Sequence, residues 1–401
     1  MENHLSAPTK IWLAETTIGH RKSLGQYMTP RALRSQLIDN VDLFPGIRVL
    51  DPSCGTGEFL KSILERQPDA VVTGWDIDPK ILEFAGQLVP QATLELRNSL
   101  DPYLGEKFDL VIGNPPYFQY KPPVSVKRHF SQVISGRPNI FALFFQVAFE
   151  CITEIGQIAY VIPPSMNNGA YFSSLREYVI SQSSIKYLSV IEDAHKFDDA
   201  QTAVQLLVLQ VGKNSKRNVF QTENRSANFK RLIFSANAER IAELFNGRMT
   251  LFEFGYQAIT GSVVWNQHKD KLSDGPGEGL VPLIWAHNIT DGKIILNSAN
   301  KKKPQYVRTS NFLAGPAIIV NRIVGGVGSG ELRVGLIEPN MKFVGENHVN
   351  VIRAHTKNPL ICFESLLKKL RAPEISERIR LITGNTQISA TELNHLIPLD
   401  N

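Results

Sequence analysis

Short apolar runs alternate with amphipathic stretches through the first 210 residues. The apolar runs predict strands over residues 48–50, 71–75, 93–96, 108–112 and 157–162. The stretches between them predict helices over residues 57–66 and 79–88 and an apolar helix over residues 140–153. Strands that alternate with helices are typical of a parallel sheet with helices on both faces. We therefore predict a doubly wound α/β fold for this part of the chain.

The pattern changes near residue 213, where residues 213–217 form a basic, polar stretch typical of a linker. Beyond it the strands are shorter, for example over 293–296 and 317–320, and a glycine-rich segment follows at 325–330. The sequence therefore predicts two domains, an α/β domain over residues 1–212 and a smaller mixed α+β domain over residues 213–401.

Composition agrees with two folded domains, since the chain has 401 residues and 43% of them are hydrophobic. Residues 1–212 hold 18 Lys and Arg against 22 Asp and Glu, whereas residues 213–401 hold 25 against 16. A basic second half favours a polyanionic partner. A scattered, solvated surface has the same composition, and charge alone does not choose between these interpretations.

Cysteine usage indicates neither a disulfide framework nor a zinc site, because the three cysteines lie far apart and none belongs to a CxxC motif. We expect a protein of the reducing cytoplasm that binds no metal. The sequence also lacks a run of about 18 apolar residues, so we expect no membrane span.

Polar residues stand where four of the predicted strands end, namely Asp51, Asp76, Asn98 and Asn114. In open parallel sheets, ligands bind at the carboxyl ends of the strands. The sequence therefore places a ligand site at this edge of the predicted sheet.

The first two strand ends indicate a nucleotide cofactor. The turn from Asp51 to Gly57 lacks both the P-loop lysine and the GxGxxG pattern, and its acidic residue suits an amine-bearing ligand better than a phosphate. A carboxylate at the end of the second strand accepts both hydroxyls of a ribose in other nucleotide-binding sheets. We expect these contacts from the following residues: Asp51, Ser53, Gly55 and Gly57 in the turn, Asp76 on the ribose, Ile77 on the adenine face, and Asn98 on the adenine amino group. Asp78 is predicted to cap the next helix.

Residues Asn114-Pro115-Pro116-Tyr117 form the most specific motif. Two prolines stiffen the loop and remove N–H donors, so the loop presents acceptors. The side-chain oxygen of Asn114 and the carbonyl oxygen of Pro115 together suit both protons of a planar amino group. Tyr117 offers an aromatic face beside them. This pattern favours chemistry on an exocyclic amine.

The order of these motifs resembles the gamma-class, TaqI-like DNA adenine-N6 methyltransferases of type II restriction–modification systems. The block Gly25-Gln26-Tyr27-Met28-Thr29-Pro30 comes first, and the cofactor turn, Asp76 and the Asn-Pro-Pro-Tyr loop follow in the order of that class. The resemblance covers residues 23–211. It implies S-adenosylmethionine as the cofactor, with Tyr27, Thr29 and Pro30 in the block that closes over its methionine part.

The resemblance further implies that an adenine flips out of double-stranded DNA, stacks on Tyr117 and is methylated at N6 without a covalent intermediate. Asn98-Ser99 departs from the acidic and aromatic pair usual in the class. A second aromatic normally completes the base sandwich; Phe229 is our candidate and Phe197 the alternative. Cys54 is predicted to be a packing residue rather than a nucleophile.

The second half resembles a TaqI-like target-recognition domain in residues 279–283, 317–320 and 388–393. Candidate DNA contacts are basic residues: Lys127 and Arg128 in the predicted loop 118–138, Lys301, Lys302 and Lys303, and Arg322 as a base reader. Residues 118–138 also suit a plain surface loop.

Other amine methyltransferases share the Asn-Pro-Pro-Tyr loop, including enzymes acting on a guanine of ribosomal RNA or on a release-factor glutamine. A cytosine-N4 enzyme and a non-catalytic specificity subunit are further alternatives. The N-terminal block and the basic second half favour DNA adenine. We expect a monomer in the cytoplasm of a bacterium or archaeon that protects host DNA, with any cognate endonuclease as a separate protein.

Overall fold

A computed structural model describes residues 5–136, 138–191, 203–212, 215–296, 303–322, 332–383 and 388–401. The chain forms two compact units. The N-terminal unit is Met1–Gln221 with Leu232–Ala238, and the C-terminal unit is Thr222–Arg231 with Glu239–Asn401. A two-stranded hairpin of β8 (Val219–Asn224) and β9 (Phe229–Phe234) contributes residues to both units. The predicted border at residue 212 falls before this hairpin.

The N-terminal unit is built on a seven-stranded sheet of order β3-β2-β1-β4-β5-β7-β6. Strands β1 to β5 are parallel, and β7 runs antiparallel to both of its neighbours. The strands are β1 (Arg48–Asp51), β2 (Val71–Asp76), β3 (Thr93–Leu96), β4 (Phe108–Gly113), β5 (Ile152–Ile162), β6 (Ser183–Ile191) and β7 (Val204–Val211).

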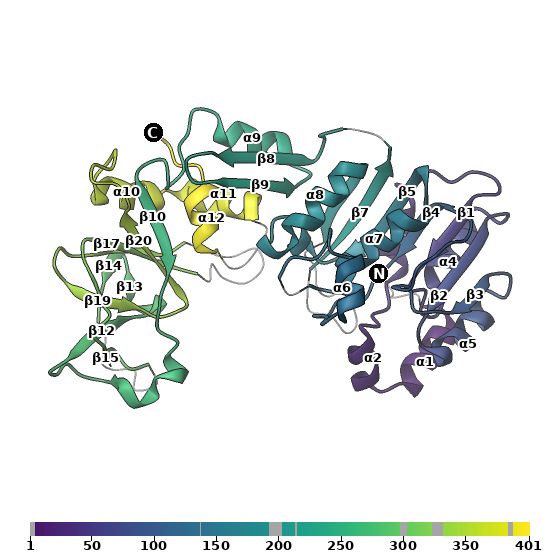
Figure 1. Cartoon of the computed structure of the whole chain (residues 1–401), viewed down its shortest axis with the longest axis horizontal. Helices are drawn as coiled ribbons and strands as arrows, with labels where there is room; N and C mark the ends of the chain where they lie inside the picture. The colour runs from purple at the N-terminus through teal and green to yellow at the C-terminus, as the bar shows by residue number, and fades with distance from the viewer. Residues whose placement is uncertain are drawn as a thin grey trace. The chain divides into compact units, whose positions relative to one another are not determined.

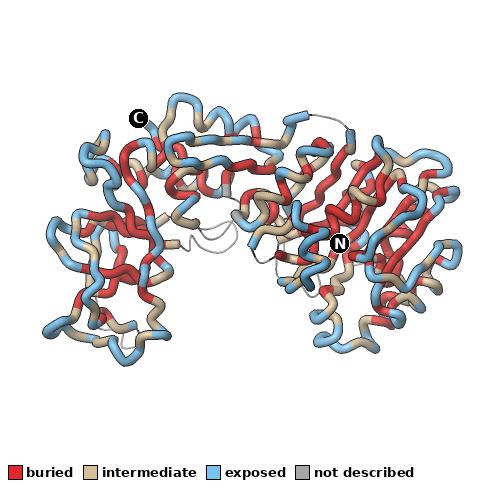
Figure 2. The backbone as a smooth tube through the Cα atoms, viewed as in Figure 1, coloured by how far each residue is buried: buried red, intermediate tan, exposed pale blue. Residues whose placement is uncertain are grey.

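Helices cover both faces of this sheet, so the predicted doubly wound α/β fold is confirmed (Figure 1). One core contains side chains of α3, α4 and α5 against Val49, Leu110 and Val161. The other contains side chains of α7 and α8 against Val111 and Tyr160. The helices of this unit are α1 (Ala7–Glu15), α2 (Ile18–Leu24), α3 (Arg31–Ile38), α4 (Glu58–Arg66), α5 (Pro79–Leu88), α6 (Val124–His129), α7 (Phe141–Cys151) and α8 (Ser173–Gln182). Figure 2 shows the central strands buried between these layers.

The predicted helix over residues 140–153 ends earlier, at Cys151, and β5 begins at Ile152 rather than at residue 157. The pairing of β4 with β5 shifts register between Phe108 and Leu110, which lets the early residues of β5 join the sheet. A β-bulge of this kind cannot be located from periodicity alone. The predicted loop 118–138 also contains a helix, α6, which follows Pro123.

The C-terminal unit contains a six-stranded sheet of order β10-β20-β17-β18-β14-β13 and a five-stranded sheet of order β11-β15-β12-β19-β16. The strands are β10 (Tyr256–Thr260), β11 (Leu272–Ser273), β12 (Leu280–Ile284), β13 (Ile289–Thr290), β14 (Gly292–Ile294), β15 (Tyr306–Arg308), β16 (Leu313–Ala314), β17 (Ala317–Asn321), β18 (Val334–Ile337), β19 (Lys342–Gly345) and β20 (Val349–Ala354). The predicted strands over 293–296 and 317–320 correspond to β14 and β17. The glycine-rich segment 325–330 lies outside the described residues.

Helices pack on one face of the six-stranded sheet, where Leu366, Ile379 and Leu393 meet Ile318 and Ile352. The other face packs through Ile319 and Val351 against Ile284 and Phe343 of the five-stranded sheet. The helices are α9 (Ala238–Phe245), α10 (Phe363–Leu370), α11 (Pro373–Thr383) and α12 (Ala390–His395). Within the described ranges of the whole chain, no helix is long and apolar enough to span a membrane.

Candidate active site

A cavity of about 280 Å³ opens at the carboxyl ends of β1, β2 and β4 in the N-terminal unit. It brings together residues from the N-terminal block, the cofactor turn, the ends of β2 and β3, and the Asn-Pro-Pro-Tyr loop. The predicted site residues that line it are Tyr27, Thr29, Asp51, Ser53, Gly55, Asp76, Ile77, Asn98, Asn114 and Pro116. Segments up to 90 residues apart in sequence therefore meet at one sheet edge, as expected for a parallel sheet.

Four predicted site residues lie next to this cavity without lining it. Pro30 is buried at the start of α3, and Pro115 is buried in the reaction loop. Gly57 precedes α4 with φ +85°, and a Cβ there would lie 2.9 Å from Val89 Cγ2, so only glycine fits. Tyr117 packs against the core of this unit.

The turn from Asp51 to Gly57 is fixed by backbone hydrogen bonds to the neighbouring strand. The amide of Cys54 donates to Trp75 O at 2.9 Å, and the amide of Gly55 donates to Asp76 Oδ2 at 2.9 Å. The amide of Asp78 donates to the other oxygen of Asp76 at 3.0 Å. Asp78 itself caps α5 by accepting from Lys80 N, which confirms the predicted cap.

Asp51 and Asp76, the acidic residues at the ends of β1 and β2, are both buried. Among the described residues, the hydrogen bonds given for their carboxylates come from backbone N–H groups rather than from cationic side chains. Burial raises the pKa of Asp51 to about 8, although the Ser53 N–H lowers it and nearby Asp76 raises it further. Burial also raises the pKa of Asp76 to about 6 against the lowering effect of the Asp78 and Gly55 N–H groups. Burial disfavours the ionised form of a carboxylate, and a nearby positive charge stabilises it. These two carboxylates therefore suit a ligand that carries positive charge.

Two further polar atoms in the cavity wall fit a nucleotide cofactor. Ser53 Oγ and Gln26 Oε1 are buried and have no hydrogen-bond partner among the described residues. Buried polar groups are normally satisfied, so atoms of this kind mark positions where a ligand supplies the missing partner. At the end of β3 the Asn98 side chain is exposed, donates to Asp101 Oδ1 at 3.1 Å and accepts from Leu100 N at 3.2 Å.

Asn114 is half-buried at the end of β4 and is held by the N-terminal block. Its Nδ2 donates to Tyr27 O at 3.0 Å and to Thr29 Oγ1 at 3.1 Å. The hydroxyl of Tyr117 contacts Asn114 Oδ1 and lies 2.6 Å from Val161 O. A carbonyl oxygen has two lone pairs, so Oδ1 can accept from a further donor beside Tyr117.

The ring of Tyr117 lies nearly parallel to that of Tyr27, with centroids 6.5 Å apart and 16° between the planes. Its edge meets Phe141 at 6.4 Å and 89°. Burial raises the pKa of Tyr117 well above its ordinary value, so the phenol stays protonated. The hydroxyl of Tyr117 therefore helps to orient Asn114, and its ring offers an aromatic face.

Sequence reasoning missed several residues that line the cavity. Phe118 and Tyr120 follow Pro116 at alternating positions, and an isolated bridge between Gln119 and Asn139 keeps this segment extended. Ile140 and Phe144 lie one helical turn apart at the start of α7. Both spacings are visible in the sequence and could have identified these residues. Arg97, which stacks over Trp75 at 4.7 Å, has no comparable signal.

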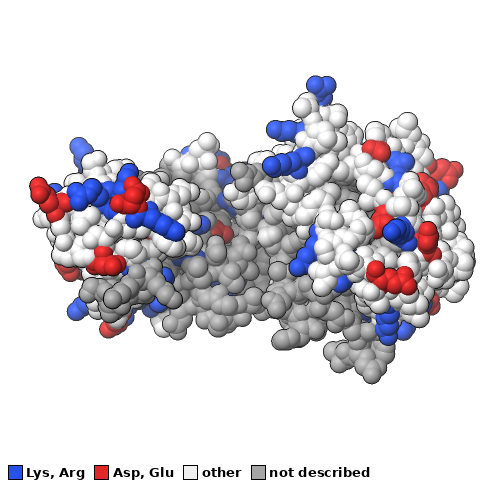
Figure 3. Space-filling model, turned by 90° about the horizontal axis from the view of Figure 1, so that it is seen from below, with Lys and Arg blue, Asp and Glu red and all other residues white. Residues whose placement is uncertain are grey.

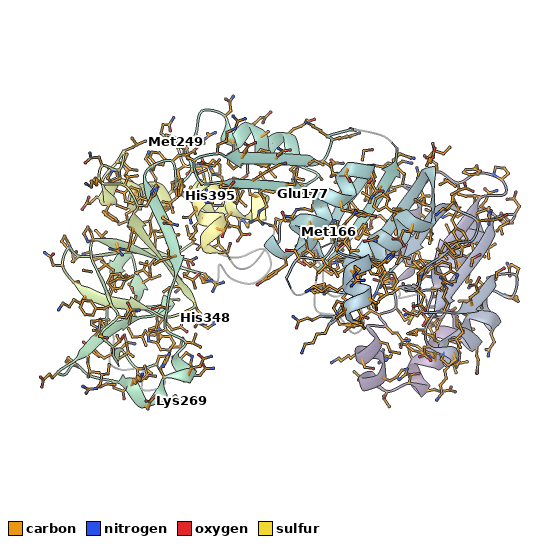
Figure 4. The ribbon with its side chains drawn as sticks, viewed as in Figure 1. Met166, Glu177, Met249, Lys269, His348 and His395 are labelled. Atoms are coloured by element: carbon orange, nitrogen blue, oxygen red, sulfur yellow. The ribbon has the colours of Figure 1, made fainter. Side chains whose placement is uncertain are left out.

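Of the remaining predicted residues, Lys127 and Arg128 belong to the N-terminal unit and do not line this cavity, whereas Phe229, Lys303 and Arg322 belong to the C-terminal unit. Phe229 belongs to the C-terminal unit, where it stacks on His395 at 4.3 Å and lies 5.6 Å from the Arg231 guanidinium. Figure 4 labels His395 in this unit. Its role as the second stacking aromatic stays a prediction, and the alternative Phe197 lies outside the described residues.

The basic candidates occupy different settings. Lys127 and Arg128 are exposed in the last turn of α6. Lys303 lies 5.5 Å over the Trp285 ring, whereas Lys301 and Lys302 lie outside the described residues. Arg322 is half-buried and donates to Asn347 O at 3.0 Å.

Cys54 is buried at the cofactor turn, where a Cβ on Gly74 would lie 2.8 Å from its sulfur. Burial also raises the pKa of its thiol, so it behaves as a packing residue, as predicted. Within the described ranges, no cluster of three or more His, Cys, Asp or Glu side chains could hold a metal ion.

Comparisons with known proteins give a family match and relatives of known name. Residues 75–197 match the Eco57I restriction-modification methylase family. The chain is 25% identical over 387 residues to modification methylase CviBIII of Paramecium bursaria Chlorella virus NC1A, covering 94% of this chain and 93% of that protein. It is 26% identical to the type II methyltransferase M.CvrRI of Paramecium bursaria Chlorella virus XZ-6E, covering 83% of each.

Among solved structures, the type I restriction-modification methyltransferase subunit from Streptococcus thermophilus is 16% identical with a TM-score of 0.41, covering 58% of this chain and 60% of that one. By its Eco57I-family match at residues 75–197 and its similarity to these two methylases along most of its length, the chain is similar to type II restriction-modification methylases, and its cofactor is S-adenosylmethionine.

Proposed function

We propose that this protein methylates N6 of an adenine that has been flipped out of double-stranded DNA at a specific sequence. The N-terminal unit binds the cofactor and carries the reaction, and the C-terminal unit recognises the target. The observation that carries the proposal is the orientation of Asn114 in the cavity wall. Its Nδ2 donates to the carbonyl oxygen of Tyr27, so its Oδ1 is the end available to a substrate amine.

The chemistry follows from two acceptors. When bound, S-adenosylmethionine supplies an electrophilic methyl group on a sulfonium. Asn114 Oδ1 and the Pro115 carbonyl accept hydrogen bonds from the two N–H groups of the adenine amine, which turns the nitrogen lone pair out of the ring system. The lone pair then forms a bond to the methyl carbon as the carbon–sulfur bond breaks, S-adenosylhomocysteine is the leaving group, and the surplus N6 proton passes to water. Holding two reactants in line contributes up to about 7–11 kcal/mol to lowering the barrier. The reaction needs no covalent enzyme intermediate, in keeping with the buried, inert Cys54.

Aromatic contacts stabilise the extrahelical base in this proposal. Flipping costs a few kcal/mol of stacking and pairing, which stacking and hydrogen bonds in the pocket offset. Tyr117 is the first stacking partner and Phe229 the candidate for the second. Asp76 is proposed to accept from the ribose hydroxyls of the cofactor, with Ile77 against its adenine, and Asp51 and Ser53 face its polar end.

Cofactor binding is expected to depend on pH because ionised Asp51 binds a cationic amine better than the protonated acid does. Its pKa of about 8 in the free protein means that affinity rises as pH increases from 6 to 8, by at most about tenfold per unit for one proton. Calorimetric titration with S-adenosylhomocysteine across this range measures the effect. The Asp51→Asn variant should bind weakly with a flat profile, and a flat wild-type profile would contradict the assignment.

The related methylases suggest that the modification protects host DNA from a cognate endonuclease, which we propose is a separate protein. We further propose that the enzyme acts as a monomer in the cytoplasm of its host cell. Figure 3 shows Lys and Arg mixed with Asp and Glu over the part of the N-terminal unit in view at the right. We therefore propose that DNA contacts in this unit come from individual exposed cations, namely Lys127 and Arg128 of α6, which follows the reaction loop in sequence.

Removing Lys127 and Arg128 together is expected to weaken DNA binding equally for all sequences. Each lost phosphate contact lowers the slope of log K against log salt by about 0.9, so the double alanine variant should lose up to about two units of slope. Fluorescence anisotropy at several salt concentrations measures this slope. Lys61→Ala with Lys80→Ala, on helices that cover the opposite sheet face, is the matched control. An unchanged slope would remove these residues from the DNA interface.

The experiment that tests the function is single-molecule sequencing of DNA from a methylation-free host that expresses the chain. N6-methyladenine at one short motif, absent with the Asn114→Ala variant, is the expected result. N4-methylcytosine would instead identify a cytosine enzyme. Unmodified DNA, with S-adenosylhomocysteine binding intact in the purified protein, would redirect the proposal to an amine of ribosomal RNA guanine or of a release-factor glutamine.

A further inference from the structure

We propose that Thr29 is a positioning residue, which holds the Asn114 amide with its oxygen toward the substrate amine. This inference rests on the proposed function, because it takes Asn114 as the acceptor of that amine. Thr29 is 4% exposed, and its Oγ1 accepts a hydrogen bond from Asn114 Nδ2 at 3.1 Å. The sequence predicted only a cofactor contact for this residue.

The two ends of an asparagine amide have almost the same shape but opposite hydrogen-bonding character. Only the oxygen end can accept protons from a substrate amine, so the orientation of Asn114 decides whether the site works. The carbonyl of Tyr27 is solely an acceptor and lies 3.0 Å from Nδ2. A flipped amide would place two oxygens against each other there. The Tyr27 carbonyl therefore sets the orientation of the amide, and the Thr29 hydroxyl adds a second hydrogen bond to the same nitrogen, which holds the amide in the position that this orientation requires.

Thr29 is itself fixed by a buried network. Arg34 Nη1 donates to Thr29 O at 2.5 Å, and Arg34 Nη2 lies 2.7 Å from Glu58 Oε2, with both side chains less than a tenth exposed. Glu58 Oε1 accepts from Ser6 and from Thr9 Oγ1 at 2.8 Å. The threonine therefore connects the reaction loop to three helices, α1, α3 and α4.

The segment that carries Thr29 also packs directly on the reaction loop. Gly25 has φ +66°, and a Cβ there would lie 2.8 Å from Pro116 Cβ and 3.1 Å from Tyr117 N. This close approach leaves the segment and the loop in one fixed arrangement. Thr29 is thus placed to act on Asn114 within a rigid frame.

The test uses Thr29→Val, which keeps the shape and removes the hydroxyl. Loss of one hydrogen bond predicts a fall in kcat of about three- to tenfold at saturating cofactor. The dissociation constant of S-adenosylhomocysteine should stay within about twofold. Thr29→Ser should restore kcat. Thr73→Val, another buried threonine in β2 of the same unit, is the control and should match the wild type.

Two outcomes for Thr29→Val would overturn the inference. A weaker cofactor affinity with unchanged kcat would make Thr29 a cofactor contact. Unchanged kcat and unchanged cofactor affinity would mean that its hydroxyl has no role in the reaction. A readout independent of the substrate separates this failure from failure of the proposed function. In asparagine-labelled full-length protein, the Asn114 side-chain amide signal, identified by its loss in Asn114→Ala, should shift in Thr29→Val and return in Thr29→Ser. An unmoved signal would refute the positioning role even if adenine proved not to be the substrate.

Discussion

Replacing Asn114 by alanine is expected to lower kcat for methyl transfer by about 10²- to 10³-fold, the loss typical of removing one preorganised polar group at a reacting centre. The variant loses the acceptor that engages the substrate amine. Cofactor binding should change little, because the buried acids of the cofactor turn are hydrogen-bonded to backbone amides of their own segments. Steady-state transfer of a radiolabelled methyl group to DNA, together with cofactor titration, measures both quantities.

The matched control is Asn40→Ala, which removes an amide whose Nδ2 donates to the helix carbonyl of Gln36 in the same unit. It should keep wild-type kcat. Near-normal kcat in Asn114→Ala would defeat the mechanism. A parallel loss of cofactor affinity would show instead that Asn114 supports the cofactor turn. The two variants thus separate a chemical role from a structural one.

Replacing Arg34 by methionine should destabilise the N-terminal unit by about 3–5 kcal/mol. The change leaves the Glu58 carboxylate buried without its charged partner and removes the hydrogen bonds to Ser62 Oγ and Thr29 O. Donors from Ser6 and Thr9 still reach Glu58, which places the expected loss near the lower end of this range. Urea unfolding followed by hydrogen exchange in β1 and β4 reports the free energy for this unit.

Arg31 provides the control on the same helix. Its ion pair with Glu65 is solvent-exposed, so Arg31→Met should cost less than about 1 kcal/mol. The double variant Arg34→Met with Glu58→Met should regain part of the loss, since it removes the unpaired charge. A loss below 1 kcal/mol in Arg34→Met alone would mean that the pair does not hold the N-terminal block in place.

The strands and helices of the N-terminal unit could be predicted because each is a local periodic pattern. The cavity could be placed for the same reason, since a parallel sheet brings successive strand ends to one edge. The contact between Asn114 and Tyr27 could not be foreseen, because it joins residues 87 positions apart through a backbone carbonyl. A backbone acceptor leaves no side-chain signature in a sequence.

The C-terminal unit was less accessible to sequence reasoning for a different reason. Several of its strands have only two or three residues, as in β11, β13 and β16, and such runs are too short to show a period. Its sheets also mix parallel and antiparallel pairs between distant strands. Phe229 illustrates the consequence: its aromatic character was visible, but its stacking partner His395 lies 166 positions later.

The hairpin of β8 and β9 determines how the C-terminal unit, which we propose recognises the target, could be exchanged for another. Residues Leu232–Ala238 return to the N-terminal unit, where Phe234 lies in the core and its amide donates to Asn167 O at 3.0 Å. A single cut after residue 212 or 221 would therefore strip this core segment from the methylase unit. A functional chimaera needs three joints, one near Thr222, one before Leu232 and one after Ala238, so that residues 232–238 are retained from the parent. Exchanging the C-terminal unit therefore means replacing the tip of the hairpin, Thr222–Arg231, as well as Glu239–Asn401.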